Sequence, residues 1–293
     1  MYSFLKSKII LALYFQENHV SWVALDRRKK LFDQVVDSGI GSCESCVAEM
    51  IEKYEGAELK IVLSAAYVAY RRQLFDSVVS EKMAESFIAE HRSDLFFNSD
   101  KVQVHKNLVN NAEACDFFLL AIPDEVLHGV LSKFPDPKLY CSGMTVDLLV
   151  LSTFMSEAEL VSHNVLFVFI DKFHLSALFI DQQSNSYMLW TKASEKSMPQ
   201  RLDYLYRRLL VEYSAEYSSG LSIEEVVLQS PMENNHQIKL PFESDYCSFA
   251  DWVQRKTLLD LKGVHTECYL PWMFLLLEEK ANVKRFAATA ISH

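Results

Sequence analysis

The chain contains 293 residues, half of them apolar, and carries a formal net charge of −10 at pH 7. This length can bury a large core or form two domains, and the 7 glycines and 7 prolines are too few to suggest disorder. The acidic balance argues against broad binding to nucleic acid or to anionic lipid, because both ligands require a basic face.

Targeting and cysteine signals indicate an unexported chain. No uninterrupted apolar stretch reaches the roughly 18–20 residues that cross a bilayer. The N-terminal run Ile9–Phe15 is too short for this, and it lacks the small-residue cleavage site of a secretory signal. The six cysteines are scattered, which favours a reducing compartment over a disulfide framework.

A mixed α/β unit opens the chain. Lys8–Phe15 is an apolar run, His19–Leu25 alternates as a half-buried strand does, and Leu31–Val36 reads as a third short strand. Ser42–Tyr54 carries apolar residues at helical spacing, and Leu59–Leu63 is a further buried strand. The predicted order is β-β-β-α-β.

The same order returns in the second half. Apolar strands are predicted at Val165–Ile170, Leu175–Ile180 and Tyr187–Trp190, followed by an amphipathic helix at Ser197–Tyr217 and a strand at Val226–Gln229. Two ordinary α/β stretches could match by coincidence. Because order and span both agree, internal duplication is the favoured interpretation.

The middle of the chain predicts further strands and helices. The strand Tyr67–Phe75 precedes a helix at Glu81–Phe97, for which Ser80 is a suitable N-cap. The later expected elements are strands at Val102–Leu108, Asp116–Ile122, Leu139–Ser142 and Ile238–Phe242, and helices at Pro123–Lys133, Thr145–Glu159, Ser248–Leu261 and Thr266–Lys280.

The duplicated unit, with Asp171 at the first turn of its second copy, resembles the actin-like fold. The stretches DFFLLAIPDEVLHGVL and TVDLLVLSTF, the latter with Asp147, resemble the cytoplasmic actin-like assembly proteins of type IV pili (PilM) and the cytoplasmic domain of the type II secretion protein GspL. Within this group, the inner-membrane component of the bundle-forming pilus is a similar protein. The resemblance covers roughly Lys8 to Lys280.

This resemblance implies an α/β, duplicated actin-like (ribonuclease H-like) fold with two β-β-β-α-β halves. We expect a first half at residues 1–160 with an inserted β/α subdomain at about 66–108, and a second half at 161–280. Residues 281–293 are expected to form a connector or tail.

The phosphate-binding turns of an actin-like ATPase are not matched here. Such turns need glycine, so that backbone amides can approach phosphate oxygens. The first turn, Phe15–His19, has no glycine, and in the second, Asp171–His174, only the vestigial Asp171 could hold Mg²⁺ through water. Gln229–Met232 stands where ATP-binding members carry a glycine pair. We therefore expect no cofactor, metal or catalytic residue. The alternative is an actin-like ATPase or sugar-kinase-type phosphotransferase with degenerate loops.

A weaker alternative is a thiol-redox protein. Cys43 and Cys46 form a CxxC at the start of a predicted helix, where a thiolate would be stabilised. The surrounding pattern is not that of a thioredoxin unit, and a lone CxxC does not make a zinc site. Two ordinary cysteines one turn apart are the simpler interpretation.

The function that the resemblance implies is that of a non-enzymatic scaffold at the cytoplasmic face of the bacterial inner membrane. Such a scaffold links the assembly or secretion ATPase to inner-membrane pilus or secretion proteins. It allows for a membrane tether beyond His293 and for a homodimer. For partner binding we expect the strand residues Tyr70, Arg71, Arg72 and Phe75, because aromatic and arginine side chains suit an edge that accepts a partner segment. An inner strand with ordinary arginines is an equal alternative.

Overall fold

The computed structural model forms two compact units, which are described separately. The larger contains residues 1–66 and 136–293, and the smaller runs from Tyr67 to Pro135. The structure describes residues 8–16, 19–29, 35–75, 78–96, 102–109, 115–134, 140–170, 174–183, 185–192, 197–216, 220–229, 245–257 and 264–277.

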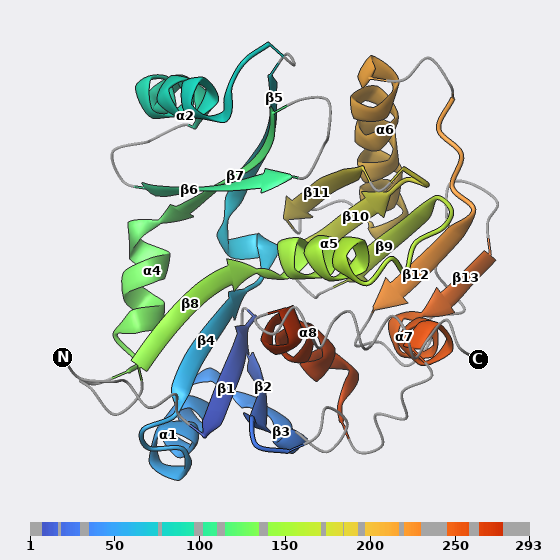
Figure 1. Cartoon of the computed structure of the whole chain (residues 1–293). Coiled ribbons are helices and arrows are strands. Elements are labelled where there is room, and N and C mark those ends of the chain that lie inside the picture. The colour runs from blue at the N-terminus through green and yellow to red at the C-terminus, as the bar shows by residue number, and fades with distance from the viewer. Residues whose placement is uncertain are drawn as a thin grey trace. The chain divides into compact units, whose positions relative to one another are not determined.

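The first half of the larger unit is a five-stranded sheet in the order β3-β2-β1-β4-β8 (Figure 1). β1 pairs antiparallel with β2 and parallel with β4. One helix, α1, lies between β3 and β4 in the chain. Its N-cap residue, Ser42, accepts a hydrogen bond from the Ser45 amide. The elements are β1 (Ile9–Phe15), β2 (His19–Asp26), β3 (Val35–Ser42), α1 (Cys43–Lys53), β4 (Glu58–Leu63) and β8 (Tyr140–Val146).

The strand expected at Leu31–Val36 differs from β3. Residues 31–34 lie outside the described residues, and β3 continues to Ser42, so the expected end at Val36 was wrong. A long-range contact explains the difference. A Cβ on Gly39 would lie 2.5 Å from the ring of Trp22 on β2, so glycine lets β3 pair beside this side chain.

The second half repeats this arrangement in the order β11-β10-β9-β12-β13. β9 pairs antiparallel with β10 and parallel with β12, as β1 does with β2 and β4. The predicted duplication of a β-β-β-α-β unit is therefore confirmed. The elements are β9 (Val165–Ile170), β10 (His174–Ile180), β11 (Ser186–Lys192), α6 (Met198–Glu216), β12 (Glu225–Gln229) and β13 (Asp245–Ser248). β13 was not predicted, and the strand expected at Ile238–Phe242 lies outside the described residues.

Side chains repeat as well as strands. β2 reads HVSWVALD, and β10 together with the following Asp181 reads HLSALFID, so histidine, serine and aspartate recur at equal positions. The aspartates have the same role, since each accepts a backbone hydrogen bond two residues further on. Asp26 accepts from the amide of Arg28 at 3.0 Å, and Asp181 from that of Gln183 at 2.8 Å.

Two helices lie side by side between the sheets (Figure 1). Phe154 of α5 and Trp272 of α8 approach with ring centroids 6.4 Å apart. The helix expected from Thr145 starts later, because β8 pairs with β4 as far as Val146. The remaining elements of this unit are α5 (Asp147–Glu157), α7 (Phe249–Thr257), η5 (Thr266–Cys268) and α8 (Tyr269–Leu277), and η2 (Ala65–Tyr67) leads out of it.

The smaller unit contains an antiparallel sheet in the order β5-β7-β6. Helix α2 packs on it around Ala84, Ile88 and Phe117. The helix expected at Glu81–Phe97 is divided at His91 into α2 and α3. The elements are β5 (Ala69–Phe75), α2 (Glu81–Glu90), α3 (Arg92–Leu95), β6 (Val102–Val109), β7 (Cys115–Pro123) and α4 (Asp124–Leu131). The insert expected at about 66–108 covers β5, both helices after it and most of β6.

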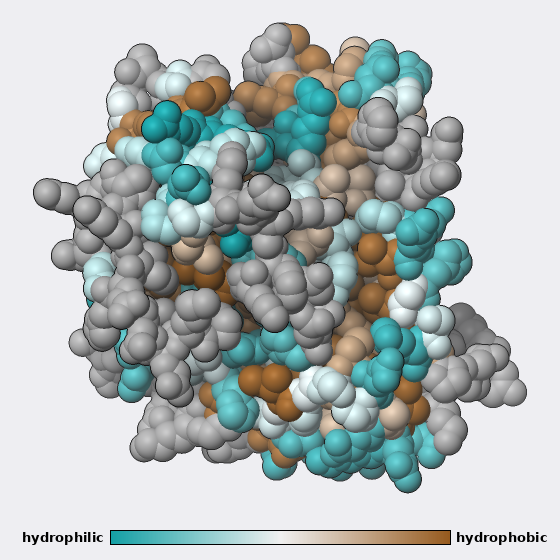
Figure 2. Space-filling view, turned by 180° about the vertical axis from the view of Figure 1, so that it is seen from behind, coloured by the Kyte–Doolittle hydropathy of each residue, from teal (hydrophilic) through white to brown (hydrophobic). Residues whose placement is uncertain are grey.

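On the face drawn in Figure 2, polar side chains surround smaller apolar patches among the described residues. Large apolar side chains are well exposed at Val78 (87%), Val211 (69%) and Met83 (62%). Of the helices described, none combines the length and the apolar character needed to cross a membrane.

Candidate functional site

A cavity of about 490 Å³ lies in the larger unit, beside the ends of the β1–β2 and β9–β10 hairpins. Its wall combines hydroxyl, imidazole, amide and carboxyl groups with a few apolar side chains. The lining residues are Tyr14, Gln16, His19, Ile40, Ser64, Asp147, Phe169, Ile170, His174, Ser176, Gln229, His265, Thr266 and Glu267.

Asp147 is the most buried acid of this wall, with 2% of its surface exposed. It begins α5, directly after β8. The Tyr14 hydroxyl donates to its Oδ2 at 2.8 Å, and the amides of Ala65 and Leu148 donate to its Oδ1 at 3.0 and 2.6 Å. Burial raises the pKa of Asp147 to about 6, although all three hydrogen bonds act in the opposite direction. The carboxylate thus connects β1, the first residue of η2 and α5.

Glu267 of η5 is held by two side chains of β2. Its carboxylate Oε2 lies 2.7 Å from His19 Nε2, and its backbone carbonyl accepts a hydrogen bond from Ser21 Oγ at 2.9 Å. The neighbouring Cys268 thiol contacts the carbonyl of Gly39 at 3.4 Å. These contacts attach η5 to the first sheet, and Glu267 keeps 22% of its side chain exposed.

The second half supplies the opposite part of the wall. His174 and Ser176 of β10 are 7% and 5% exposed. At the end of β12, the Oε1 atom of Gln229 is buried and has no hydrogen-bond partner among the described residues. Since a buried acceptor without a donor is costly, this atom marks a place where a ligand could donate a hydrogen bond.

The described wall does not fit a nucleoside polyphosphate. None of its fourteen residues is lysine, arginine or glycine, whereas two of them are acids. A polyphosphate needs cations, or glycine-rich turns that present backbone amides. Of the expected turns, residues 17–18, 171–173 and 230–232 lie outside the described residues, and Asp171 with them.

Cys46 of the CxxC pair does not have the features of a reactive thiol. Cys46 is 3% exposed, and burial, with a contribution from the Glu49 charge, raises the pKa of its thiol to about 12. A thiol with such a pKa is protonated at neutral pH and is a poor nucleophile. Across the described residues, no three histidine, cysteine, aspartate or glutamate side chains are grouped as a metal site would require.

The expected partner-binding residues lie on β5, an edge strand that pairs with β7 alone in the described part of the smaller unit. Alternation along a strand places Arg71 and Phe75 on one face, and Tyr70 and Arg72 on the other. Phe75 packs edge-on against Phe87 and Phe117, with centroids at 5.5 and 6.1 Å. Phe75 therefore contributes to the core of this unit, while Arg71 is exposed.

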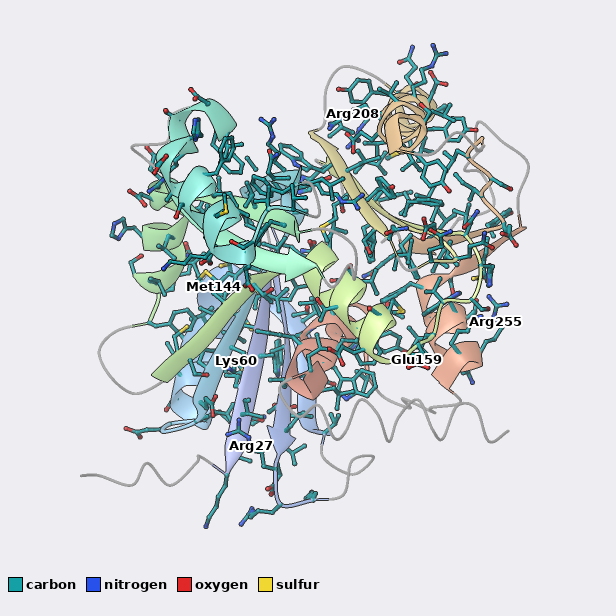
Figure 3. The ribbon with its side chains drawn as sticks, turned by 45° about the horizontal axis from the view of Figure 1, so that its top comes forward. Arg27, Lys60, Met144, Glu159, Arg208 and Arg255 are labelled. Carbon is teal, nitrogen blue, oxygen red and sulfur yellow. The ribbon has the colours of Figure 1, made fainter. Side chains whose placement is uncertain are left out.

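Sequence reasoning missed two charged clusters in the larger unit. On the first sheet, Glu58 binds Arg27 NH1 at 2.6 Å and the Ser142 hydroxyl at 2.6 Å, and lies 3.6 Å from the Lys60 ammonium. Figure 3 labels Arg27 and Lys60 in this region. Although burial opposes ionisation, these partners lower the pKa of Glu58 to about 2. Its partners Arg27 and Ser142 are 31 and 84 residues away, so no local pattern announces the cluster.

The second cluster surrounds Glu225 of β12. Its carboxylate accepts from Arg255 at 2.8 Å and from the Trp252 indole at 3.1 Å, and lies 3.0 Å from His163 Nε2. Arg255 is labelled in Figure 3. Burial opposes ionisation, but the three partners outweigh it and lower the pKa of Glu225. The cluster joins β12, β13 and α7.

Comparisons with known proteins give structural matches only. No protein-family model matches the chain, and no curated protein sequence matches it. PilM, in the PilM–PilN type IV pilus biogenesis complex, aligns with a TM-score of 0.61 at 12% identity, over 92% of this chain and 98% of that one. The cytoplasmic domain of EpsL, an inner-membrane component of the type II secretion system of Vibrio cholerae, aligns with a TM-score of 0.53 at 9% identity, over 82% and 88%.

The chain has the actin-like fold. A third structure, a Bacteroides thetaiotaomicron protein of actin-like ATPase fold and unknown function, agrees at a TM-score of 0.50 and 13% identity, over 84% of this chain and 94% of that one. The predicted fold class, a duplicated actin-like α/β fold, is thus confirmed, as is the resemblance to PilM and to the secretion protein's cytoplasmic domain. At such low identity the likeness shows the fold and not the activity.

Proposed function

We propose that the chain is a non-enzymatic scaffold of a bacterial type IV pilus or type II secretion assembly platform, located at the cytoplasmic face of the inner membrane. The observation that carries this proposal is the nearly full-length alignment with both PilM and the EpsL cytoplasmic domain. Its partners would be inner-membrane proteins of the platform and the assembly ATPase.

The cavity wall supports a non-enzymatic role over the alternative of an actin-like ATPase or phosphotransferase. Phosphoryl transfer depends on cations and backbone amides that stabilise charge on the transferred group. The described lining has neither lysine nor arginine nor glycine, and it includes Asp147 and Glu267.

For partner binding we propose the open edge of β5. Backbone groups along an edge strand can pair with an extended segment of another protein, and side chains on the strand then add specificity. Arg71 is exposed there, so we expect an acidic side chain on the incoming segment. Met83 and Phe87 of α2 are exposed, and Phe87 packs edge-on against Phe75 of β5. These two side chains provide apolar area beside the strand.

The experiment is co-purification of the full chain with its platform proteins from cells that express them. Arg71→Glu reverses an exposed charge and should leave the melting temperature unchanged while reducing recovery of the partners at least about tenfold. Arg207→Glu, at an exposed position of α6, is the matched control and should recover them normally. Equal recovery with both variants would contradict the β5 assignment, and recovery of no platform protein by the parent chain would contradict the scaffold role.

A further inference from the structure

Three side chains form a row across the sheet of the second half, on the face that borders the cavity. Ser176 of β10 pairs with Phe169 of β9, and Phe169 in turn pairs with Gln229 at the end of β12. Residues in register on neighbouring strands point to the same face of a sheet, and all three line the cavity. An aromatic ring therefore lies between a hydroxyl and a carboxamide.

The two polar side chains of this row have unused hydrogen-bonding capacity. The Oε1 atom of Gln229 is buried and accepts no hydrogen bond from any residue that the structure describes. Ser176 is 5% exposed, and its hydroxyl makes no hydrogen bond within the described part of the chain. Buried polar groups in native structures are nearly always paired, so two such groups on one side of a cavity point to a bound molecule as their partner.

The described wall of the cavity is acidic, which indicates the charge of that molecule. Its two carboxylates are Asp147 and Glu267, and neither lysine nor arginine occurs among the described lining residues. The three hydrogen bonds to Asp147 come from a hydroxyl and two backbone amides, which leave its charge uncompensated. Glu267 contacts His19 through Oε2, and 22% of its side chain is exposed. Such a wall favours a cation over an anion.

We propose that this cavity binds the primary ammonium group of a small organic molecule. An ammonium has three N–H donors and no acceptor, so it can donate to both Gln229 Oε1 and Ser176 Oγ. The backbones of these two residues are two strand spacings apart, roughly 10 Å, which leaves room for one such group between the side chains. The ring of Phe169, which lies between them, attracts the cation and contacts the adjoining methylene groups.

The size of the cavity and the distribution of its acids agree with this ligand class. A volume of about 490 Å³ lies within the range of small-molecule sites, roughly 300–1,000 Å³. A divalent metal ion fits less well, because it requires several closely grouped oxygen ligands. The described residues contain no group of three histidine, cysteine, aspartate or glutamate side chains placed to hold one.

A ligand-observed NMR titration of the full chain with n-pentylamine, at a pH of about 7.5 where imidazoles are mostly neutral, tests the proposal. n-Pentanol has a hydroxyl in place of the ammonium and should bind at least about tenfold more weakly, because hydrogen bonds to charged groups are the stronger ones. Mg-ATP represents the polyphosphate class. The proposal is overturned if n-pentylamine does not bind at millimolar concentration, if the two pentyl compounds bind equally, or if Mg-ATP displaces n-pentylamine from the chain.

Variants at position 229 locate the binding. Gln229→Glu places a negative charge beside the ammonium and should tighten n-pentylamine binding about fivefold or more. Gln229→Met removes the acceptor and should weaken this binding about fivefold or more. A general loss of structure would not shift the affinity in both directions. Glu52→Gln, at an exposed position of α1, is the matched control for net charge and should bind n-pentylamine as the parent chain does.

Thermal melts accompany each titration to show that the variants fold. Ser176→Ala removes only a hydroxyl, so it keeps the test decisive if a Gln229 variant fails to fold, and it should weaken n-pentylamine binding about threefold or more. Unchanged binding to a folded Ser176→Ala or Gln229→Met protein would overturn the assignment.

Discussion

Tyr14 and Asp147 are 133 residues apart in the chain, yet the tyrosine hydroxyl donates a 2.8 Å hydrogen bond to the buried carboxylate. The bond joins the central strand of the first sheet to the first residue of α5. Since α5 lies between the two sheets, this contact helps to hold the two actin-like halves in register.

Removal of the Tyr14 hydroxyl should therefore destabilise the larger unit. Tyr14→Phe leaves a buried carboxylate oxygen without its donor, and we expect the free energy of unfolding to fall by about 1–3 kcal/mol. Urea denaturation measures this loss. Tyr204→Phe on the exposed face of α6 is the control, with an expected change of at most about 0.5 kcal/mol. Equal effects of the two substitutions would show that the bond does not stabilise the fold.

The raised pKa of Asp147 predicts a pH dependence of stability. An aspartate has a pKa near 3.8 in the unfolded chain and about 6 here, so between these values the folded state retains a proton that the unfolded state releases. The contribution of Asp147 is thus present at low pH and is lost as pH rises through about 6. Relative to Asp147→Asn, the parent chain should lose about 2 kcal/mol between about pH 4.5 and 7.5.

Denaturation of both proteins across this pH range measures the difference, and the other titrating groups cancel because they are common to the two chains. The pKa direction assigned to Asp147 would be contradicted if the stability of the parent chain relative to Asp147→Asn did not change with pH, or if it increased as pH rises.

The carboxylate of Glu58 should be needed to compensate the positive charge of the buried Lys60, whose side chain is 5% exposed. Glu58→Gln leaves this ammonium with a neutral neighbour, and we expect a loss of about 3 kcal/mol in the free energy of unfolding. Glu58→Gln combined with Lys60→Met removes both charges and should recover more than half of that loss. Chemical denaturation of the two proteins decides the matter, and additive losses in the double variant would exclude the coupling.

Removal of either of its two charged neighbours should change the alkylation rate of the Cys247 thiol, and the two changes should have opposite signs. Burial is the main reason that the pKa of its thiol is raised to about 11; the Glu225 charge also raises this pKa, and Arg255, 2.8 Å from the sulfur, lowers it. Glu225→Gln should accelerate alkylation of Cys247 by iodoacetamide about threefold or more at pH 8, and Arg255→Gln should slow it. Peptide mass spectrometry separates Cys247 from the other cysteines. A shift of both variants in the same direction would indicate a change in exposure instead of charge.

Local hydrophobic pattern was enough to predict β1, β2, β9 and β10, because these strands are buried runs bounded by polar turns. The late end of β3 was missed because its pairing depends on Gly39 beside Trp22, a contact between strands. The cavity also escaped prediction, since its wall combines segments as distant as Tyr14 and Glu267.

One signal for the site was present in the sequence. The recurring histidine and serine become visible once β2 and β10 are aligned as repeats, but the contact of His19 and Ser21 with Glu267 depends on a residue 246 positions away from Ser21 along the chain. The sequence predicted the strand Tyr67–Phe75 but did not indicate which of its side chains are buried. The structure shows that Phe75 packs against Phe87, whereas Arg71 is exposed.

The central claim is that β5 of this actin-like chain receives a protein of the pilus or secretion platform. Site-specific photocrosslinking in living cells tests it most directly, with benzoylphenylalanine in place of Arg71 and, as a control, of Arg207. The account predicts an adduct from position 71, identified by mass spectrometry as an inner-membrane platform protein or its assembly ATPase, and no such adduct from position 207. Equal adducts from both positions, or none with any platform component, would contradict it.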